Sequence, residues 1–122
     1  MDDLSVEILG AGRKNITVQV WGILTKNLPV PRVIFTLEDI GCSKFRFESV
    51  VFAVQEKSGF YLWWKGKDSN KSLILPLESR GAFNFEPVQC LHSPPDTVGI
   101  ALTSFGVDGP KAFRLILDLG AQ

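Results

Sequence analysis

Apolar and polar side chains alternate along several short stretches of this chain, and this two-residue period constrains the fold more than any other feature of the sequence. In the clearest stretch, residues 112–119, apolar side chains recur at Phe113, Leu115, Leu117 and Leu119. Successive side chains of a β-strand point to opposite faces, so this alternation is typical of a strand with one buried face. Strands are predicted at 15–23, 32–37, 44–54, 59–66, 73–77, 82–85, 98–103 and 112–119. The chain is therefore predicted to be all-β.

Two of these stretches also fit the spacing of a helix. The apolar residues of 47–54 recur at helical intervals, and Pro110 could occupy the first position of a helix before the last stretch. Strict alternation through Arg114 and Asp118, without alanine-rich filler, favours strands in both places. A short helical turn is considered for residues 87–91.

Glycine, proline, asparagine and aspartate separate the stretches at short, even intervals. Glycine, asparagine and aspartate tolerate positive φ, and proline fixes φ at about −65°. Such residues therefore mark turns, as at Ser58-Gly59. About eight short strands with such spacing predict an antiparallel β-sandwich, jelly-roll-like or immunoglobulin-like, with a small barrel as the alternative. Residues 1–122 are expected to form this single domain, with residues 1–12 as a candidate N-terminal arm.

The length of the chain is sufficient for one hydrophobic core. A domain of 122 residues buries about two thirds of the surface that its open chain exposes, and 45% of these residues are hydrophobic. The alternation assigns the following side chains to the core or its border: Val18, Val20, Val51, Leu62, Leu115 and Leu117.

Charge and cysteine content restrict the partners and the compartment. Thirteen Lys and Arg balance thirteen Asp and Glu, whereas nucleic-acid binding normally needs a basic surplus. No apolar segment with a basic lead opens the chain, so Cys42 and Cys90 are predicted to be free thiols in a reducing compartment. No apolar run approaches the roughly 20 residues of a membrane-spanning helix. We expect neither a nucleic acid nor a membrane as partner.

The residue types that carry catalysis do not gather in a recognisable motif. His92 is the single histidine, and its pairing with Cys90 lacks the second ligand pair of a zinc site and the third group of a catalytic triad. The adjacent carboxylates Glu38 and Asp39 are expected at a solvated strand end. We therefore predict that the protein is not an enzyme and that it has no catalytic residues, no metal and no cofactor.

A cluster of aromatic residues gives the best indication of function. Phe60, Tyr61, Trp63 and Trp64 lie within five residues, and neighbouring tryptophans on a strand face opposite sides. Trp64 shares a face with Phe60 and Leu62 and is predicted to enter the core, while Trp63 faces outward. An outward tryptophan is covered by a loop, contacts a partner protein or stacks on a sugar. The predicted partner-binding residues are Phe60, Tyr61 and Trp63.

The order of these features resembles that of small structural proteins of tailed bacteriophages. The resemblance rests on residues 62–64 (Leu-Trp-Trp), residues 75–81 (Leu-Pro-Leu-Glu-Ser-Arg-Gly), the proline-containing loop 93–95 and the closing strand 112–119. It covers roughly residues 16–119 and is a likeness of arrangement more than of exact motif. The similar proteins are capsid decoration, or cement, proteins and related minor virion components.

This resemblance implies a β-sandwich without catalysis, displayed in many copies on a capsid. It leads us to expect a non-enzymatic virion structural protein that binds the assembled shell. The expected partners are the major capsid protein or other virion proteins, together with contacts between copies on the particle. The expected location is the virion, after synthesis in the host cytoplasm without a secretion signal. The alternative is a carbohydrate-binding β-sandwich that uses its exposed tryptophans.

Overall fold

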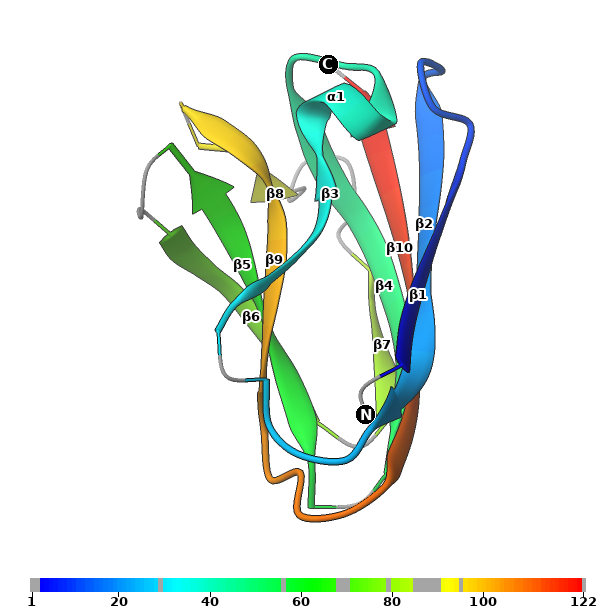
Figure 1. Ribbon diagram of the computed structural model, residues 1–122. Coiled ribbons are helices and arrows are strands. Elements are labelled where there is room, and N and C mark those ends of the chain that lie inside the picture. Colours follow the sequence, from blue (N-terminus) through cyan, green and yellow to red (C-terminus); the bar gives the residue numbers. More distant parts are fainter. Residues whose placement is uncertain are drawn as a thin grey trace.

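Two antiparallel sheets face each other in the computed structural model, which describes residues 3–28, 30–55, 57–67, 71–78, 80–84, 91–94 and 96–121 (Figure 1). The larger sheet has the order β1-β2-β10-β4-β7, with a short β8 also paired to β4. Its strands are β1 (Asp3–Leu9), β2 (Asn15–Leu24), β10 (Lys111–Ala121), β4 (Phe45–Val54), β7 (Arg80–Asn84) and β8 (Leu91–His92). The smaller sheet has the order β3-β9-β5-β6. Its strands are β3 (Arg32–Thr36), β9 (Thr97–Phe105), β5 (Gly59–Gly66) and β6 (Lys71–Glu78). The predicted antiparallel β-sandwich is confirmed.

Aromatic rings from both sheets meet in the core between the two layers. The Trp64 ring of β5 lies 5.5 Å from the Phe45 ring and 5.4 Å from the Phe47 ring, both on β4. Further along the core, Phe60 packs on Phe113 with ring centroids 4.7 Å apart. Five of the six predicted core residues are completely buried, namely Val18, Val20, Leu62, Leu115 and Leu117.

The sixth predicted core residue, Val51, is 49% exposed, and that prediction is wrong. A β-bulge explains the error. Asp118 of β10 pairs with Ser49, but the next residue of β10 pairs with Phe47, so Glu48 is an extra residue in β4. The extra residue reverses the alternation, and Val50 is buried in place of Val51.

Residues 3–9 form a paired strand, which corrects the expectation of an N-terminal arm. All seven residues of β1 are in antiparallel register with β2, from Asp3 opposite Ile23 to Leu9 opposite Thr17. Ile8 of β1 packs against the core. The described start of the chain is therefore an edge strand of the larger sheet.

A single helical turn, α1 (Leu37–Ile40), follows β3 and corrects the prediction that Glu38 and Asp39 lie at a strand end. Thr36 caps it, because its hydroxyl accepts from the Asp39 N–H while the Asp39 carboxylate accepts from the Thr36 N–H. Gly41 ends the turn at φ 71°, a conformation that favours glycine. The helical turn considered for 87–91 lies outside the described residues, except for Leu91, which belongs to β8.

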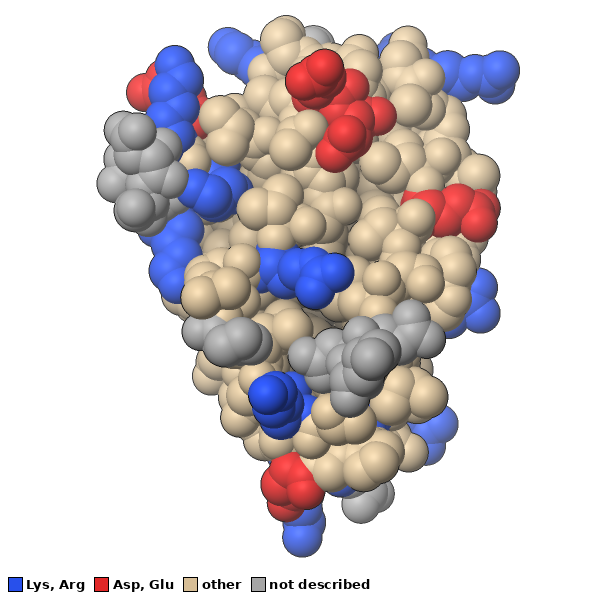
Figure 2. Space-filling model, in the orientation of Figure 1, with Lys and Arg blue, Asp and Glu red and all other residues tan. Residues whose placement is uncertain are grey.

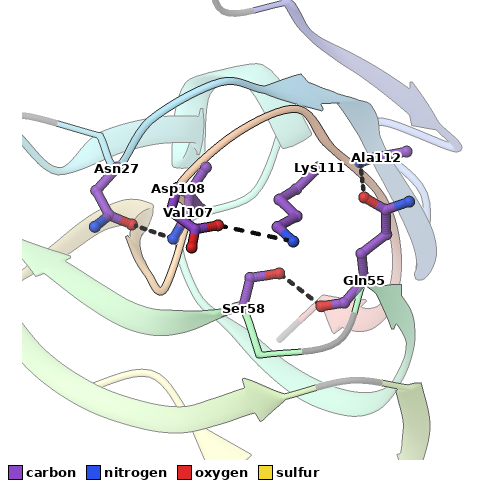
Figure 3. A network of polar contacts seen from close by, with 7 residues as sticks. All are labelled: Asn27, Gln55, Ser58, Val107, Asp108, Lys111 and Ala112. Atoms are coloured by element: carbon purple, nitrogen blue, oxygen red, sulfur yellow. Dashed lines mark hydrogen bonds and ion pairs between the residues drawn. The ribbon is translucent and has the colours of Figure 1, made fainter.

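Three loops are tied together at one end of the sandwich (Figure 3). The Asn27 side chain, after β2, accepts a 3.1 Å hydrogen bond from the Val107 N–H in the loop before β10. The Gln55 side chain, after β4, accepts from the Ala112 N–H at 3.3 Å, and the buried Ser58 hydroxyl donates to the Gln55 carbonyl at 2.6 Å. These contacts fix the start of β10 against the turn between β4 and β5.

Charged side chains of both signs are scattered over the face shown in Figure 2, with acidic groups over α1 at the top. The acidic residues of α1 are Glu38 and Asp39. Within the described part of the chain, no helix is both long and apolar enough to cross a membrane.

Candidate binding faces

The outer face of the smaller sheet carries Tyr61 and Trp63, as the alternation of β5 predicted. Their neighbours Leu62 and Trp64 are 0% and 7% exposed, so the two tryptophans point to opposite sides of the sheet. The predicted face assignment of Trp63 and Trp64 is confirmed. Phe60, in contrast, is only 1% exposed and cannot touch a partner of the folded domain. Its prediction as a partner-binding residue is corrected, because it shares the inward face with Leu62.

Polar neighbours hold the Trp63 side chain in one orientation. Its indole N–H donates a 2.8 Å hydrogen bond to the Thr103 hydroxyl of the adjacent strand β9. On the other side, the Lys71 ammonium of β6 lies 4.4 Å from the centre of the indole ring, which is within the range of a cation–π interaction. The Trp63 indole is half-buried, and these two contacts fix its orientation before any partner binds.

An apolar row runs through Trp63 across all four strands of this sheet. Trp63 pairs with Ala101 of β9 on one side and with Leu73 of β6 on the other, and Ala101 in turn pairs with Val33 of β3. Val33 and Leu73 are 43% and 50% exposed. Beside this row, the Tyr61 ring lies 6.3 Å from Trp63 and 4.9 Å from Phe105. We call this surface the aromatic face: Val33, Tyr61, Trp63, Leu73 and Phe105.

Two bulges place the outer members of that row on the surface. In β6, Leu62 pairs with Leu75 but Trp63 pairs with Leu73, so Ile74 is an extra residue. In β3, an extra residue at Ile34 has the same effect on Val33. Without these insertions, Leu73 would share the inward face of Leu75 and Val33 that of Phe35. Sequence reasoning therefore missed Val33 and Leu73, and it also missed Phe105.

The outer face of the larger sheet carries a second set of exposed apolar side chains, also missed as a site. Trp21 of β2 is 38% exposed and Ile23 is 47% exposed. They line a hollow together with Glu7, Gln19, Gly22, Phe113 and Arg114. In the alternation of residues 15–23, Trp21 falls on the face opposite to that of Val18 and Val20. This alternation was the sequence signal that could have identified Trp21 as an outward-facing residue.

Polar clusters on the larger sheet have a structural explanation. Both carboxylate oxygens of Asp118 accept 2.9 Å hydrogen bonds, one from Thr17 and one from Ser49 on the flanking strands. Among the described residues, no group of three or more His, Cys, Asp or Glu side chains could hold a metal ion.

The cysteine and histidine candidates offer no reactive centre in the described residues. Cys42 is a free thiol packed against the core. Burial raises the pKa of this thiol, although a backbone hydrogen bond at Lys44 opposes the shift. The thiol is consequently protonated at neutral pH, where the thiolate would be the reactive form. Cys90 and the side chain of His92 lie outside the described residues.

Comparison with known proteins leaves the family of this chain open. No protein-family model matches it, and no curated protein matches it. Among solved structures, it shows a likeness to peruvianin-I, a cysteine peptidase from Thevetia peruviana latex, with 14% identity and a TM-score of 0.37. The likeness covers 93% of this chain but only 60% of the peptidase chain. At this TM-score it supports no conclusion about function.

Proposed function

We propose that this domain is a non-enzymatic virion structural protein that binds the assembled capsid shell as a decoration protein, using the aromatic face. The observation that carries the proposal is the apolar row across the smaller sheet, in which Val33 and Leu73 are 43% and 50% exposed at the two ends, Trp63 is half-buried and Ala101 is covered. Exposed apolar surface is costly in water, and contiguous patches mark interaction sites. The arrangement of the sequence, which resembles that of decoration proteins, supplies the kind of partner.

The side chains of the aromatic face are already held in one conformation, which favours binding. Binding loses free energy when side chains must be immobilised at an interface. The Trp63 indole is already fixed by Thr103 and Lys71, and the Tyr61 ring is held between Trp63 and Phe105. These side chains therefore lose little conformational freedom when a partner covers them. Aromatic residues in such settings are frequently the hot spots of protein interfaces.

The geometry does not favour the carbohydrate-binding alternative. A sugar platform commonly presents coplanar rings, whereas Tyr61 is tilted by 59° to Trp63 and by 39° to Phe105. The Lys71 ammonium also occupies a face of the Trp63 ring on which a sugar would stack. A protein surface of irregular shape fits these tilted rings better.

The proposal is tested by co-sedimentation of the domain with empty shells assembled from the major capsid protein encoded in the same genome. Trp63→Ala should weaken binding about 30-fold, the equivalent of a hot spot of about 2 kcal/mol. The matched control is Leu9→Ala, which removes a side chain that is 47% exposed but lies on β1, outside the aromatic face. Absence of a capsid gene from that genome, no binding by the wild-type domain, or equal loss in both variants would contradict the proposal.

A further inference from the structure

A second surface of different chemistry lies on the outer face of the larger sheet, pointing away from the aromatic face. In the register of this sheet, Ala53 of β4 is flanked by Arg80 of β7 on one side and by Arg114 of β10 on the other. The two arginines are thus about 10 Å apart, across two strand spacings. Because the Ala53 side chain is small, the surface between the two arginines is hollowed. Its lining consists of Ala53, Val54, Gln55, Arg80, Lys111, Ala112, Phe113 and Arg114.

The hollow is basic, since the described residues of its lining include three cationic side chains and no acidic one. Lys111 is paired at 3.9 Å with Asp108, whose side chain is 89% exposed. Arg80 and Arg114 are exposed, and neither forms an ion pair with a carboxylate among the described residues. Two neighbouring guanidinium groups that no described carboxylate pairs with attract an anionic ligand.

Arg114 joins this basic hollow to the apolar one beside Trp21. Its guanidinium donates a 2.9 Å hydrogen bond from Nη2 to the Gln19 side chain, which fixes its direction. Arg114 lines both hollows, so a ligand that follows the surface passes from Arg80 and Ala53 over Arg114 to Trp21 and Ile23. We call this continuous surface the basic groove. It combines three cationic side chains at one end with the exposed apolar side chains of Trp21 and Ile23 at the other end, where Glu7 also lines it.

We propose that the basic groove binds an acidic segment of a partner protein that also carries apolar side chains. Arginine presents a planar fork of donors that matches a carboxylate, so Arg80 and Arg114 suit Asp or Glu side chains of such a segment. Trp21 and Ile23 offer an apolar surface for its remaining side chains. A nucleic acid fits less well, because the chain has no net positive charge and the groove has only a few cations.

This inference does not depend on the function proposed for the aromatic face. The two surfaces belong to different sheets and have the hydrophobic core between them (Figure 1). A domain with both surfaces occupied would connect two protein segments through a rigid sandwich. The partner of the basic groove is acidic, whereas that of the aromatic face is recognised by apolar contact.

The test measures fluorescence anisotropy of a labelled peptide of alternating Glu and Leu, titrated with the domain at low salt. The double variant Arg80→Ala/Arg114→Ala should weaken binding at least tenfold. The control variant Arg13→Ala/Lys67→Ala removes the same charge from the turn before β2 and from an exposed pair with Asp96, and it should bind like the wild type. Trp63→Ala should also bind normally, which separates this proposal from the previous one.

Two further ligands complete the experiment. A peptide with Gln in place of Glu should bind at least tenfold more weakly, because it offers no carboxylate to the arginines. A single-stranded oligonucleotide of equal charge should bind more weakly than the acidic peptide. The proposal is overturned if the acidic peptide does not bind, if both double variants lose affinity equally, or if the oligonucleotide binds more tightly.

Discussion

The two adjacent tryptophans of β5 show how much a single residue's environment decides its role. Trp64 is 7% exposed and contacts Phe45 and Phe47 of the opposite sheet. Trp63 lies on the outer face, where its indole N–H donates to the Thr103 hydroxyl and the Lys71 ammonium lies over its ring. Trp64 is therefore a residue of the core, whereas Trp63 is left on the outer face, where it is available to a partner.

Truncating each tryptophan should therefore have unequal effects on stability. Trp64→Ala leaves a large cavity between the sheets and should lower the free energy of unfolding by about 3–5 kcal/mol. Trp63→Ala loses one hydrogen bond and partial packing, and should cost about 1 kcal/mol. Urea unfolding followed by far-UV circular dichroism measures both. An equal loss in the two variants would mean that Trp63 is also a structural residue and would weaken its assignment to a binding face.

At the level of the strands, the sequence predicted the positions of all the described strands except β1 and β8, but not where their alternation changes phase. Strict alternation within β5 and β10 identified Trp64, Leu115 and Leu117 as core residues, because those strands contain no extra residue of their own. The bulge at Glu48 in β4 has no signature in a single sequence, since it depends on the partner strand.

The same limitation explains why the candidate site was only partly predicted. Tyr61 and Trp63 lie on one unbulged strand and could be found from local alternation. Val33 and Leu73 reach the aromatic face from β3 and β6, which bulges turn outward. Which strands are neighbours, and in what register, is set by tertiary packing. The assignment of Phe60 to the surface was avoidable, because it shares the face of Leu62 and Trp64.

The β4 bulge predicts opposite responses at two adjacent valines. Val50→Asp places a charge at a position with 0% exposure and should cost about 4 kcal/mol or more, enough to unfold much of a domain of this size. Val51→Asp alters a side chain that is 49% exposed and should change stability by about 0.5 kcal/mol. Thermal unfolding of the purified variants compares them. If Val51→Asp is the destabilising change, the register of β4 described above is incorrect.

The whole molecule combines two chemically distinct outer faces with one shared core. Phe60 and Trp64 of the smaller sheet interlock with Phe113, Phe45 and Phe47 of the larger one. The loops at one end add polar ties between β2, β4 and β10. Neither sheet can bury its inner face without the other, so separate unfolding of one sheet would expose the aromatic core of both.

Unfolding of the domain should therefore be a single cooperative transition. The variant Trp21→Phe/Trp63→Phe retains Trp64 as its single tryptophan, so its fluorescence reports contact between the sheets, while far-UV circular dichroism reports the strands themselves. Because Trp64 lies 5.5 Å from Phe45, loss of that contact and loss of strand structure should have the same urea midpoint. The wild-type protein, followed by circular dichroism, controls for the two substitutions. A fluorescence transition that clearly precedes the loss of strand structure would show that the sheets separate before they unfold, and would contradict a core held jointly by Trp64, Phe45 and Phe47.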